Sequence, residues 1–430
     1  GYSASVDDFH WLKGILVELK DAEGLFYLGN AFCYRGLFKS GIGCYDESLK
    51  LEEYAETYNN RGLAYAELNQ YERAIEDFNK AIELNPAYAM AYNNRGFAYA
   101  ELNKYKQAIE DYDKAIELNP NYAIAYNNRG NAYAELNEYE RAIEDFNKAI
   151  ELNPNFAVAY NNRGVTYAEL NEHERAIKDY DKAIELNPNY AIAYYNRGVA
   201  YTELNQYERA IEDFSRVIEL NPNFAEAYNN RGIAYAKLNE HERAIKDYDK
   251  AIELNSNDAE AYYNRGIAYA ELNKYEQAIE DYDKAIELNL AFASAYYNRG
   301  LIYIELNQYE RAIKDYDKAI ELNPNFAMAY NNRGLAYAKL NKYERAIKDY
   351  NKAIELNPAL AEAYGNRGIV YLEIHRYEES ARDLKKAGIL FLHSGKKRDA
   401  VGAFYICFKL RDKIENDDIV YCGLALSLLT

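Results

Sequence analysis

The sequence predicts an all-α solenoid of stacked helix-turn-helix units, and three observations lead to it. An Asn-Arg-Gly tripeptide recurs every 34 residues from Gly62 to Gly368, which gives ten units in register. Within each unit, apolar and small residues fall at spacings of three and four, the period of a helix face. Asn-Pro closes most units, and proline cannot continue a helix. A fixed period near 34 denotes a two-helix unit that buries its apolar face against its neighbours.

The unit from Ala55 to Tyr88 shows both predicted helices. The first is followed by Asn69, a residue type that tolerates the left-handed conformation in which helices end. The second ends at Asn85-Pro86. Small residues at Gly62 and Ala74 let the two helices approach closely, and aromatic side chains fill the gaps between units. The 47 tyrosines are therefore mostly recurrent core residues.

The predicted organisation has four parts. Residues 1–21 form an N-terminal capping helix, with its apolar face inward at Trp11, Leu12, Ile15 and Leu16. Residues 22–54 form a degenerate unit with Gly29 in the glycine position. Residues 55–394 form the ten regular units. Residues 377–430, which overlap the last unit, form a long helix from Tyr377 to about Leu392 and then helices near 396–413 and 416–429, because Gly388 follows Gly368 by only 20 residues.

Two linkers lack proline, since Ser256 and Leu290 replace it. These linkers indicate either a softer hinge near the sixth and seventh units or ordinary sequence drift.

The repeated residues resemble the tetratricopeptide repeat family. The matching positions in the first unit are Tyr58, Gly62, Tyr65, Ala74, Phe78, Ala81 and Pro86, and the ten copies cover roughly 340 of the 430 residues. The resemblance implies a right-handed superhelix whose first helices line a concave surface. It also implies a scaffold or adaptor that holds a peptide or a helical segment of another protein.

One asparagine column is the predicted ligand-binding surface, because an amide offers both a donor and an acceptor to a peptide backbone. It is similar to the asparagine ladder in O-linked N-acetylglucosamine transferases. The alternative is a structural role, in which each asparagine hydrogen-bonds the neighbouring unit. The column consists of Asn60, Asn94, Asn128, Asn162, Asn196, Asn230, Asn264, Asn298, Asn332 and Asn366.

Three further columns complete the predicted groove. Tyr195, Tyr263 and Tyr297 replace asparagine in a neighbouring column and are predicted ligand contacts, since tyrosine is a frequent binding anchor. An acidic column favours partners with Lys or Arg, and it consists of Glu67, Glu101, Glu135, Glu169, Glu203, Glu271, Glu305 and Glu373, interrupted by Lys237 and Lys339. A mostly apolar column lies beside it, at Leu63, Phe97, Asn131, Val165, Val199, Ile233, Ile267, Leu301, Leu335 and Ile369. The alternative for the acidic and the apolar columns is a helix face that is simply exposed to solvent.

Arg61 and its nine equivalents recur with an aspartate sixteen residues later, as in Asp77. A partly buried guanidinium needs a carboxylate, so these residues predict a structural ion-pair ladder. The chaperone-binding members of the family clamp a terminal carboxylate with inward Lys and Arg. The corresponding columns of this chain hold mostly Asn, Tyr, Glu or apolar residues, so that activity is not expected.

Composition excludes several other functions. The net charge of −18 disfavours nucleic acid and anionic membranes. The four cysteines form no CxxC pair, and the five histidines have no partner at metal or triad spacing. We therefore expect no enzyme, cofactor, metal or membrane span. A reduced, cytoplasmic location is favoured.

The C-terminal stretch from Arg382 to Lys413 holds nine basic and three acidic residues, against an acidic body. It indicates either a docking surface for another copy or simple solvation of an end cap. The leading hypothesis is a protein–protein interaction scaffold. The alternative is a self-assembling structural array, or a regulatory or sensor arm of a larger effector protein.

Overall fold

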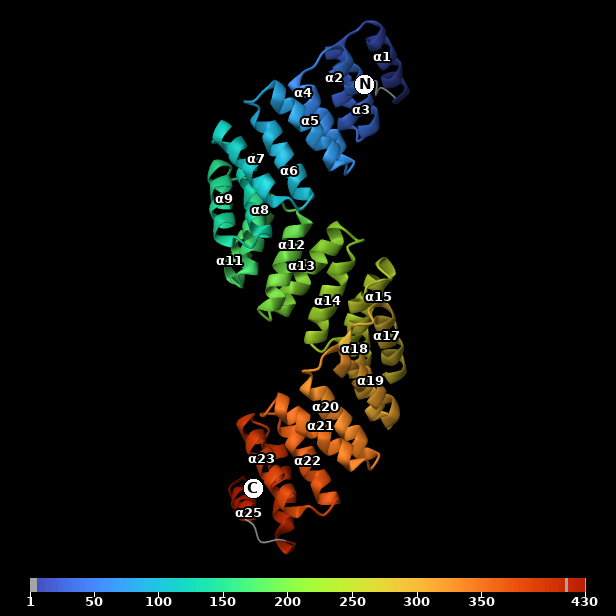
Figure 1. Cartoon of the computed structure of the whole chain (residues 1–430), viewed down its shortest axis with the longest axis vertical. Helices are drawn as coiled ribbons and strands as arrows, with labels where there is room; N and C mark the ends of the chain where they lie inside the picture. The colour runs from blue at the N-terminus through green and yellow to red at the C-terminus, as the bar shows by residue number, and fades with distance from the viewer. Residues whose placement is uncertain (1–5, 414–416, 430) are drawn as a thin grey trace. The chain divides into compact units, whose positions relative to one another are not determined.

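The computed structural model describes residues 6–413 and 417–429, with side chains from Trp11 onward (Figure 1). Residues 1–5, 414–416 and 430, which belong to the predicted N-terminal and C-terminal segments, lie outside this range. The described chain divides into two compact blocks, one ending at Asn221 and the other beginning at Pro222. All secondary structure in the described residues is helical, which confirms the all-α class. None of these helices has the length and apolar content needed to cross a membrane.

The first block contains the N-terminal helices and the first five repeats. Its helices are α1 (Val6–Glu18), α2 (Ala22–Tyr34), α3 (Phe38–Leu51), α4 (Ala55–Glu67), α5 (Tyr71–Leu84), α6 (Ala89–Glu101), α7 (Tyr105–Leu118), α8 (Ala123–Glu135), α9 (Tyr139–Leu152), α10 (Ala157–Glu169), α11 (His173–Leu186), α12 (Ala191–Glu203) and α13 (Tyr207–Leu220).

The second block contains the last five repeats and the C-terminal cap. Its helices are α14 (Ala225–Lys237), α15 (His241–Leu254), α16 (Ala259–Glu271), α17 (Tyr275–Leu288), α18 (Ala293–Glu305), α19 (Tyr309–Leu322), α20 (Ala327–Lys339), α21 (Tyr343–Leu356), α22 (Ala361–Glu373), α23 (Tyr377–His393), α24 (Lys397–Phe408), the 3₁₀ turn η1 (Lys409–Asp412) and α25 (Asp417–Leu429).

Each repeat is one helix pair, with an even-numbered first helix and an odd-numbered second helix. Within each block every helix contacts the next one along the chain, and first helices such as α6 and α8 also contact each other. The first helices of successive repeats therefore lie side by side. This stacking confirms the predicted solenoid within each block.

The turn inside each repeat depends on one residue with a positive φ, which is asparagine in every repeat but the tenth. Asn137 has a φ of 60°, in the left-handed region, and nine other repeats place asparagine or histidine at the same position with similar angles. The backbone N–H of Asn137 donates to the carbonyl of Ala134 at 2.9 Å, and that of Glu138 donates to Tyr133 at 2.9 Å. Asparagine therefore ends the first helix, because it adopts this conformation more readily than most other residues.

The glycine of each Asn-Arg-Gly motif sets the distance between the two helices. The ring of Phe146 on α9 lies directly against Gly130 on α8, so that a Cβ at Gly130 would come within 2.8 Å of Phe146 Cε1. Phe146 has no exposed surface. The same contact recurs at the C-terminal cap, where Gly388 packs against Phe404. Helix α23 therefore serves both as the second helix of the tenth repeat and as the first helix of a further pair.

The predicted arginine–aspartate pairs are confirmed in all ten repeats. Arg129 donates from Nε and Nη2 to the two oxygens of Asp145, at 2.7 Å each, and from Nη1 to Asp113 on the preceding repeat at 2.5 Å. Burial disfavours the charged guanidinium, but the hydrogen bonds and charges of the two aspartates outweigh it and raise the pKa of Arg129. The other pairs are Arg61–Asp77, Arg95–Asp111, Arg163–Asp179, Arg197–Asp213, Arg231–Asp247, Arg265–Asp281, Arg299–Asp315, Arg333–Asp349 and Arg367–Asp383.

The predicted orientation of the N-terminal helix is wrong for two residues. Trp11 is 69% exposed and Leu12 is 38% exposed, whereas Ile15 and Leu16 are half-buried. Leu16 packs against Leu28, Phe32 and Cys44 in the described structure. Apolar spacing alone does not show how far along its length a terminal helix is covered, and here the covered part lies near the end of α1.

The C-terminal helices follow the expected ranges, with one interruption. Helix α23 is a single helix of 17 residues. Helix α24 stops at Phe408, where the expected helix over 396–413 changes to the 3₁₀ turn. Ile419 and Cys422 of α25 join the same core as Phe404 and Leu410. The expected start of the last helix at residue 416 lies outside the described range.

Candidate functional site

The predicted asparagine column forms a hydrogen-bonded ladder along the first helices. Asn94 Nδ2 on α6 donates to Asn59 Oδ1 on α4 at 3.0 Å, and Asn128 on α8 donates in the same way to Asn93 at 3.2 Å. In α4, α6, α8, α10 and α20 the preceding asparagine donates back within the same helix, as Asn127 does to Asn128 Oδ1 at 3.3 Å. The structure therefore shows the hydrogen bonding between neighbouring repeats that the structural alternative required.

The ladder does not exhaust the hydrogen-bonding capacity of its amides. Asn128 uses one of its two amide hydrogens and accepts one hydrogen bond at Oδ1, and an amide oxygen has two lone pairs. One N–H and one lone pair therefore remain. The whole column is half-buried, at Asn60, Asn94, Asn128, Asn162, Asn196, Asn230, Asn264, Asn298, Asn332 and Asn366.

Two of the three predicted tyrosines form hydrogen bonds with the following repeat. The hydroxyl of Tyr263 accepts a hydrogen bond from Asn298 Nδ2 at 3.0 Å, and that of Tyr297 accepts one from Asn332 at 2.9 Å. These hydroxyls take the place of the asparagine oxygen in the ladder. The Tyr297 ring packs on Phe326 with centroids 4.6 Å apart, and burial raises the pKa of Tyr297. The Tyr195 ring lies 5.9 Å from that of Phe214, and all three tyrosines are half-buried.

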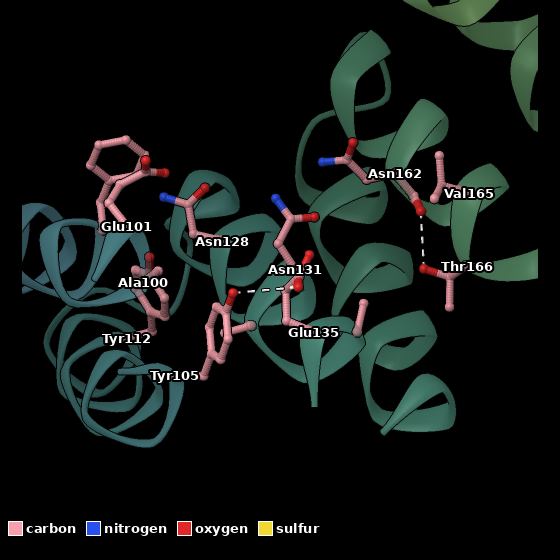
Figure 2. A pocket seen from close by; sticks show the side chains of 13 residues that line it. Ala100, Glu101, Tyr105, Tyr112, Asn128, Asn131, Glu135, Asn162, Val165 and Thr166 are labelled. Atoms are coloured by element: carbon pink, nitrogen blue, oxygen red, sulfur yellow. Dashed lines mark hydrogen bonds between the residues drawn. The ribbon is translucent and has the colours of Figure 1, made fainter. Parts of the chain in front are cut away.

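A hollow of about 410 Å³ opens on the first helices of the second, third and fourth repeats (Figure 2). Helices α6, α8 and α10 supply most of its lining, and α7 supplies two tyrosines. Three of the four predicted columns meet here. The ladder contributes Asn128 and Asn162, the apolar column contributes Phe97, Asn131 and Val165, and the acidic column contributes Glu101 and Glu135.

Hydrogen bonds between and within repeats support the walls of this hollow. The Tyr105 hydroxyl on α7 lies 3.4 Å from Glu135 Oε2 on α8 and donates to Asn103 Oδ1 at 2.9 Å. Burial, followed by the negative charge of Glu135, raises the pKa of Tyr105, so its hydroxyl stays protonated. Within α10, the Thr166 hydroxyl donates to the backbone carbonyl of Asn162 at 3.0 Å. Figure 2 draws this hydrogen bond and the contact of Tyr105 with Glu135.

Sequence reasoning did not identify Tyr105, Tyr112 and Thr166 as lining residues. Tyr105 belongs to a repeated position on the second helix, and Tyr71 makes the equivalent contact with Glu101 at 3.2 Å. The constant separation of 30 residues between these tyrosines and glutamates is visible in the sequence. The sequence does not show that this separation corresponds to a contact, because that depends on which helices of neighbouring repeats touch.

The lining of the hollow offers hydrogen-bond donors and acceptors beside apolar side chains. Its polar groups are amides, carboxylates and hydroxyls on α6, α7, α8 and α10. Among the side chains that the structure describes, no group of three His, Cys, Asp or Glu is placed to hold a metal ion.

Comparisons with known proteins agree with the repeat pattern. A family model described as Tetratricopeptide repeat matches residues 55–88, 89–122, 123–156, 157–190, 191–224, 225–258, 259–290 and 327–360. A second model of that description matches 281–314 and 349–381, and a TPR repeat model matches 300–341. No curated protein sequence matches the chain significantly.

Solved structures to which this chain is similar include a repeat protein. The crystal structure of YrrB, described as a TPR protein with an unusual peptide-binding site, is 30% identical, with 44% of this chain and 96% of that chain covered and a TM-score of 0.37. MamA is 31% identical, with 40% and 94% covered and a TM-score of 0.37. Yeast Tom70 is 19% identical, with 95% and 96% covered and a TM-score of 0.42. Because the first family model alone matches well over half of the residues, this chain belongs to the tetratricopeptide repeat family.

Proposed function

We propose that this chain is a non-catalytic protein–protein interaction scaffold that binds an extended peptide along its first helices, centred on the hollow between α6, α8 and α10. Membership of the repeat family supports the interaction function. The main observation in favour of the peptide site is that three kinds of group line one hollow of about 410 Å³. They are amides with hydrogen-bonding capacity left over, apolar side chains and carboxylates.

The three kinds of lining residue suit three parts of a peptide. The remaining N–H and lone pair of Asn128 and Asn162 match the alternating donors and acceptors of an extended backbone. Phe97 and Val165 are 42% and 38% exposed, and they offer contact to an apolar side chain. Glu101 and Glu135 are exposed and favour a Lys or Arg beside it.

Peptide selection followed by binding measurements tests this proposal. Extended peptides selected from a random library should contain apolar and basic residues, and each lost amide contact should weaken binding about three- to tenfold. The variants are Asn128→Ala, Asn162→Ala and the charge reversal Glu135→Lys. Asn155→Ala, in an exposed linker outside the hollow, is the matched control.

Glu135→Lys keeps the ladder amides, so it separates the loss of the groove from a disturbance of the stack. We expect it to reject the selected basic peptides while circular dichroism stays unchanged. If all three variants bound the peptides as the wild type does, the peptide site would lie elsewhere and the proposal would be wrong.

A second candidate function, self-association, is favoured by the C-terminal helix. Val420, Leu424 and Leu428 on α25 follow one another at intervals of four residues and are 61%, 62% and 85% exposed. The basic stretch nearby is complementary to the acidic body of another copy, although Lys385 and Lys396 already pair internally with Asp418 and Glu362. Sedimentation over a range of concentrations tests it. Assembly should depend on concentration and be lost in Leu424→Glu, and a wild type that stays monomeric would refute it.

A further inference from the structure

A separate hollow of about 380 Å³ lies in the degenerate unit near the N-terminus. Helix α2 lines it with Glu23, Phe26 and Tyr27. Tyr54, which precedes α4, and Glu56 and Thr57 in the first turn of α4 line the other side. Three aromatic rings and two carboxylates therefore share one small cavity. None of its lining residues is basic, so nothing in the lining neutralises the two glutamates.

This composition is particular to the degenerate unit. When Gly29 is aligned with Gly62, Phe26 and Tyr27 take the positions of Asn59 and Asn60 in the regular repeats. The asparagine ladder consequently ends here, and Asn60 Nδ2 donates instead to Asn30 Oδ1 at 2.9 Å. Aromatic rings thus replace the ladder amides at this end of the stack.

Tyr27 and Tyr54 are exposed, whereas Phe26 is half-buried and supported by packing. The Phe26 ring lies against Tyr45, with centroids 6.2 Å apart, and meets the Tyr27 ring edge to face at 5.3 Å. Tyr45 is almost fully buried, whereas Tyr27 is 59% exposed and Tyr54 is 41% exposed. The linker before α4 is one residue shorter than in the regular repeats and lacks proline. Tyr27 and Tyr54 therefore offer ring surface to a ligand.

We propose that this hollow binds the guanidinium or ammonium group of a basic side chain. A cation is attracted to the faces of aromatic rings, and the attraction grows where carboxylates sit beside them. A neutral apolar ligand would leave Glu23 and Glu56 without a partner. The site is distinct from the peptide hollow on α6, α8 and α10, and shares no residue with it.

Titration of the full chain with blocked amino acids tests the proposal. The probes are N-acetyl-arginine amide and N-acetyl-lysine amide, with citrulline and norleucine derivatives as neutral analogues of the same shape. We expect the two cations to bind about fivefold or more tightly than their neutral analogues. High salt should weaken the binding, because the carboxylates contribute to it.

Two variants locate the binding, and a third serves as the control. Tyr27→Asn installs the residue that regular repeats carry at this position, and the double change Glu23→Gln with Glu56→Gln removes the charge without loss of shape. Each should weaken arginine binding about fivefold or more. Tyr34→Ala, on the same helix at a residue 95% exposed and outside the hollow, should leave it unchanged.

The outcome that overturns this assignment is equal binding of arginine and citrulline, or arginine binding that survives both variants. If Tyr27→Asn disturbs the fold, the surface double variant still decides the question. The pair Asn128→Ala and Asn162→Ala should retain arginine binding, so failure of the peptide proposal and failure of this one give different results.

Discussion

Replacement of Gly130 with alanine should destabilise the third repeat, although alanine favours helices more than glycine does. A Cβ at Gly130 would lie 2.8, 3.0 and 3.1 Å from three atoms of the Phe146 ring, which has no exposed surface. Overpacking costs about 1–3 kcal/mol, and the helix propensity of alanine offsets about 1 kcal/mol. Because the ring is enclosed, we expect a net loss of about 1–2 kcal/mol in the free energy of local opening.

Native-state hydrogen exchange of peptides from α8 and α9 measures this loss. A loss of 1–2 kcal/mol corresponds to exchange about 5- to 30-fold faster, and the effect should stay near the third repeat because each repeat contacts only its neighbours. The matched control is Gly365→Ala on α22, where a Cβ would meet only Ala387 Cβ at 3.8 Å. There exchange should slow. Equal or greater protection in Gly130→Ala would refute the packing argument.

Three further predictions follow from other contacts. Arg129→Met leaves Asp145 buried without its bidentate partner, so it should destabilise the third repeat by about 3 kcal/mol in the same exchange experiment. The control Lys148→Gln breaks an exposed pair with Glu151 and should change the stability of that repeat by less than about 1 kcal/mol. Tyr316→Phe should be neutral or stabilising in thermal unfolding, because the buried Tyr316 hydroxyl has no hydrogen-bond partner among the described residues; a marked loss of stability would contradict this. Burial raises the pKa of the tyrosines that pack against the motif glycines, so the stability they contribute is present below their ordinary pKa of about 10 and is lost as the pH rises above it. These tyrosines are Tyr112, Tyr180, Tyr248, Tyr282, Tyr316 and Tyr350. As the pH rises, their ionisation, measured by ultraviolet absorbance, should coincide with loss of the helical circular dichroism signal. Gradual ionisation while the helices stay intact would contradict this prediction.

The contacts inside one repeat could be predicted from the sequence. The turn at Asn137, the contact of Gly130 with Phe146 and the pair of Arg129 with Asp145 all join positions at most sixteen residues apart. Such contacts follow from helix periodicity and from the residue types that end helices or pair when buried. Ten copies in register reinforce each of these inferences, because any exception would interrupt the pattern.

Contacts between repeats were decided only by the tertiary structure. The sequence placed Asn128 and Glu135 on a polar face, but the donation of Asn128 to Asn93 and the approach of Tyr105 to Glu135 depend on how closely neighbouring helices pack. The ends were less predictable still. Trp11 lies in solvent, and Phe26 and Tyr27 line a hollow with residues of the next unit. Periodicity within a helix gives the direction of each side chain around its own axis. The distance and offset between two helices arise from the packing of all the side chains between them. The spacing of residues along the chain does not determine that packing.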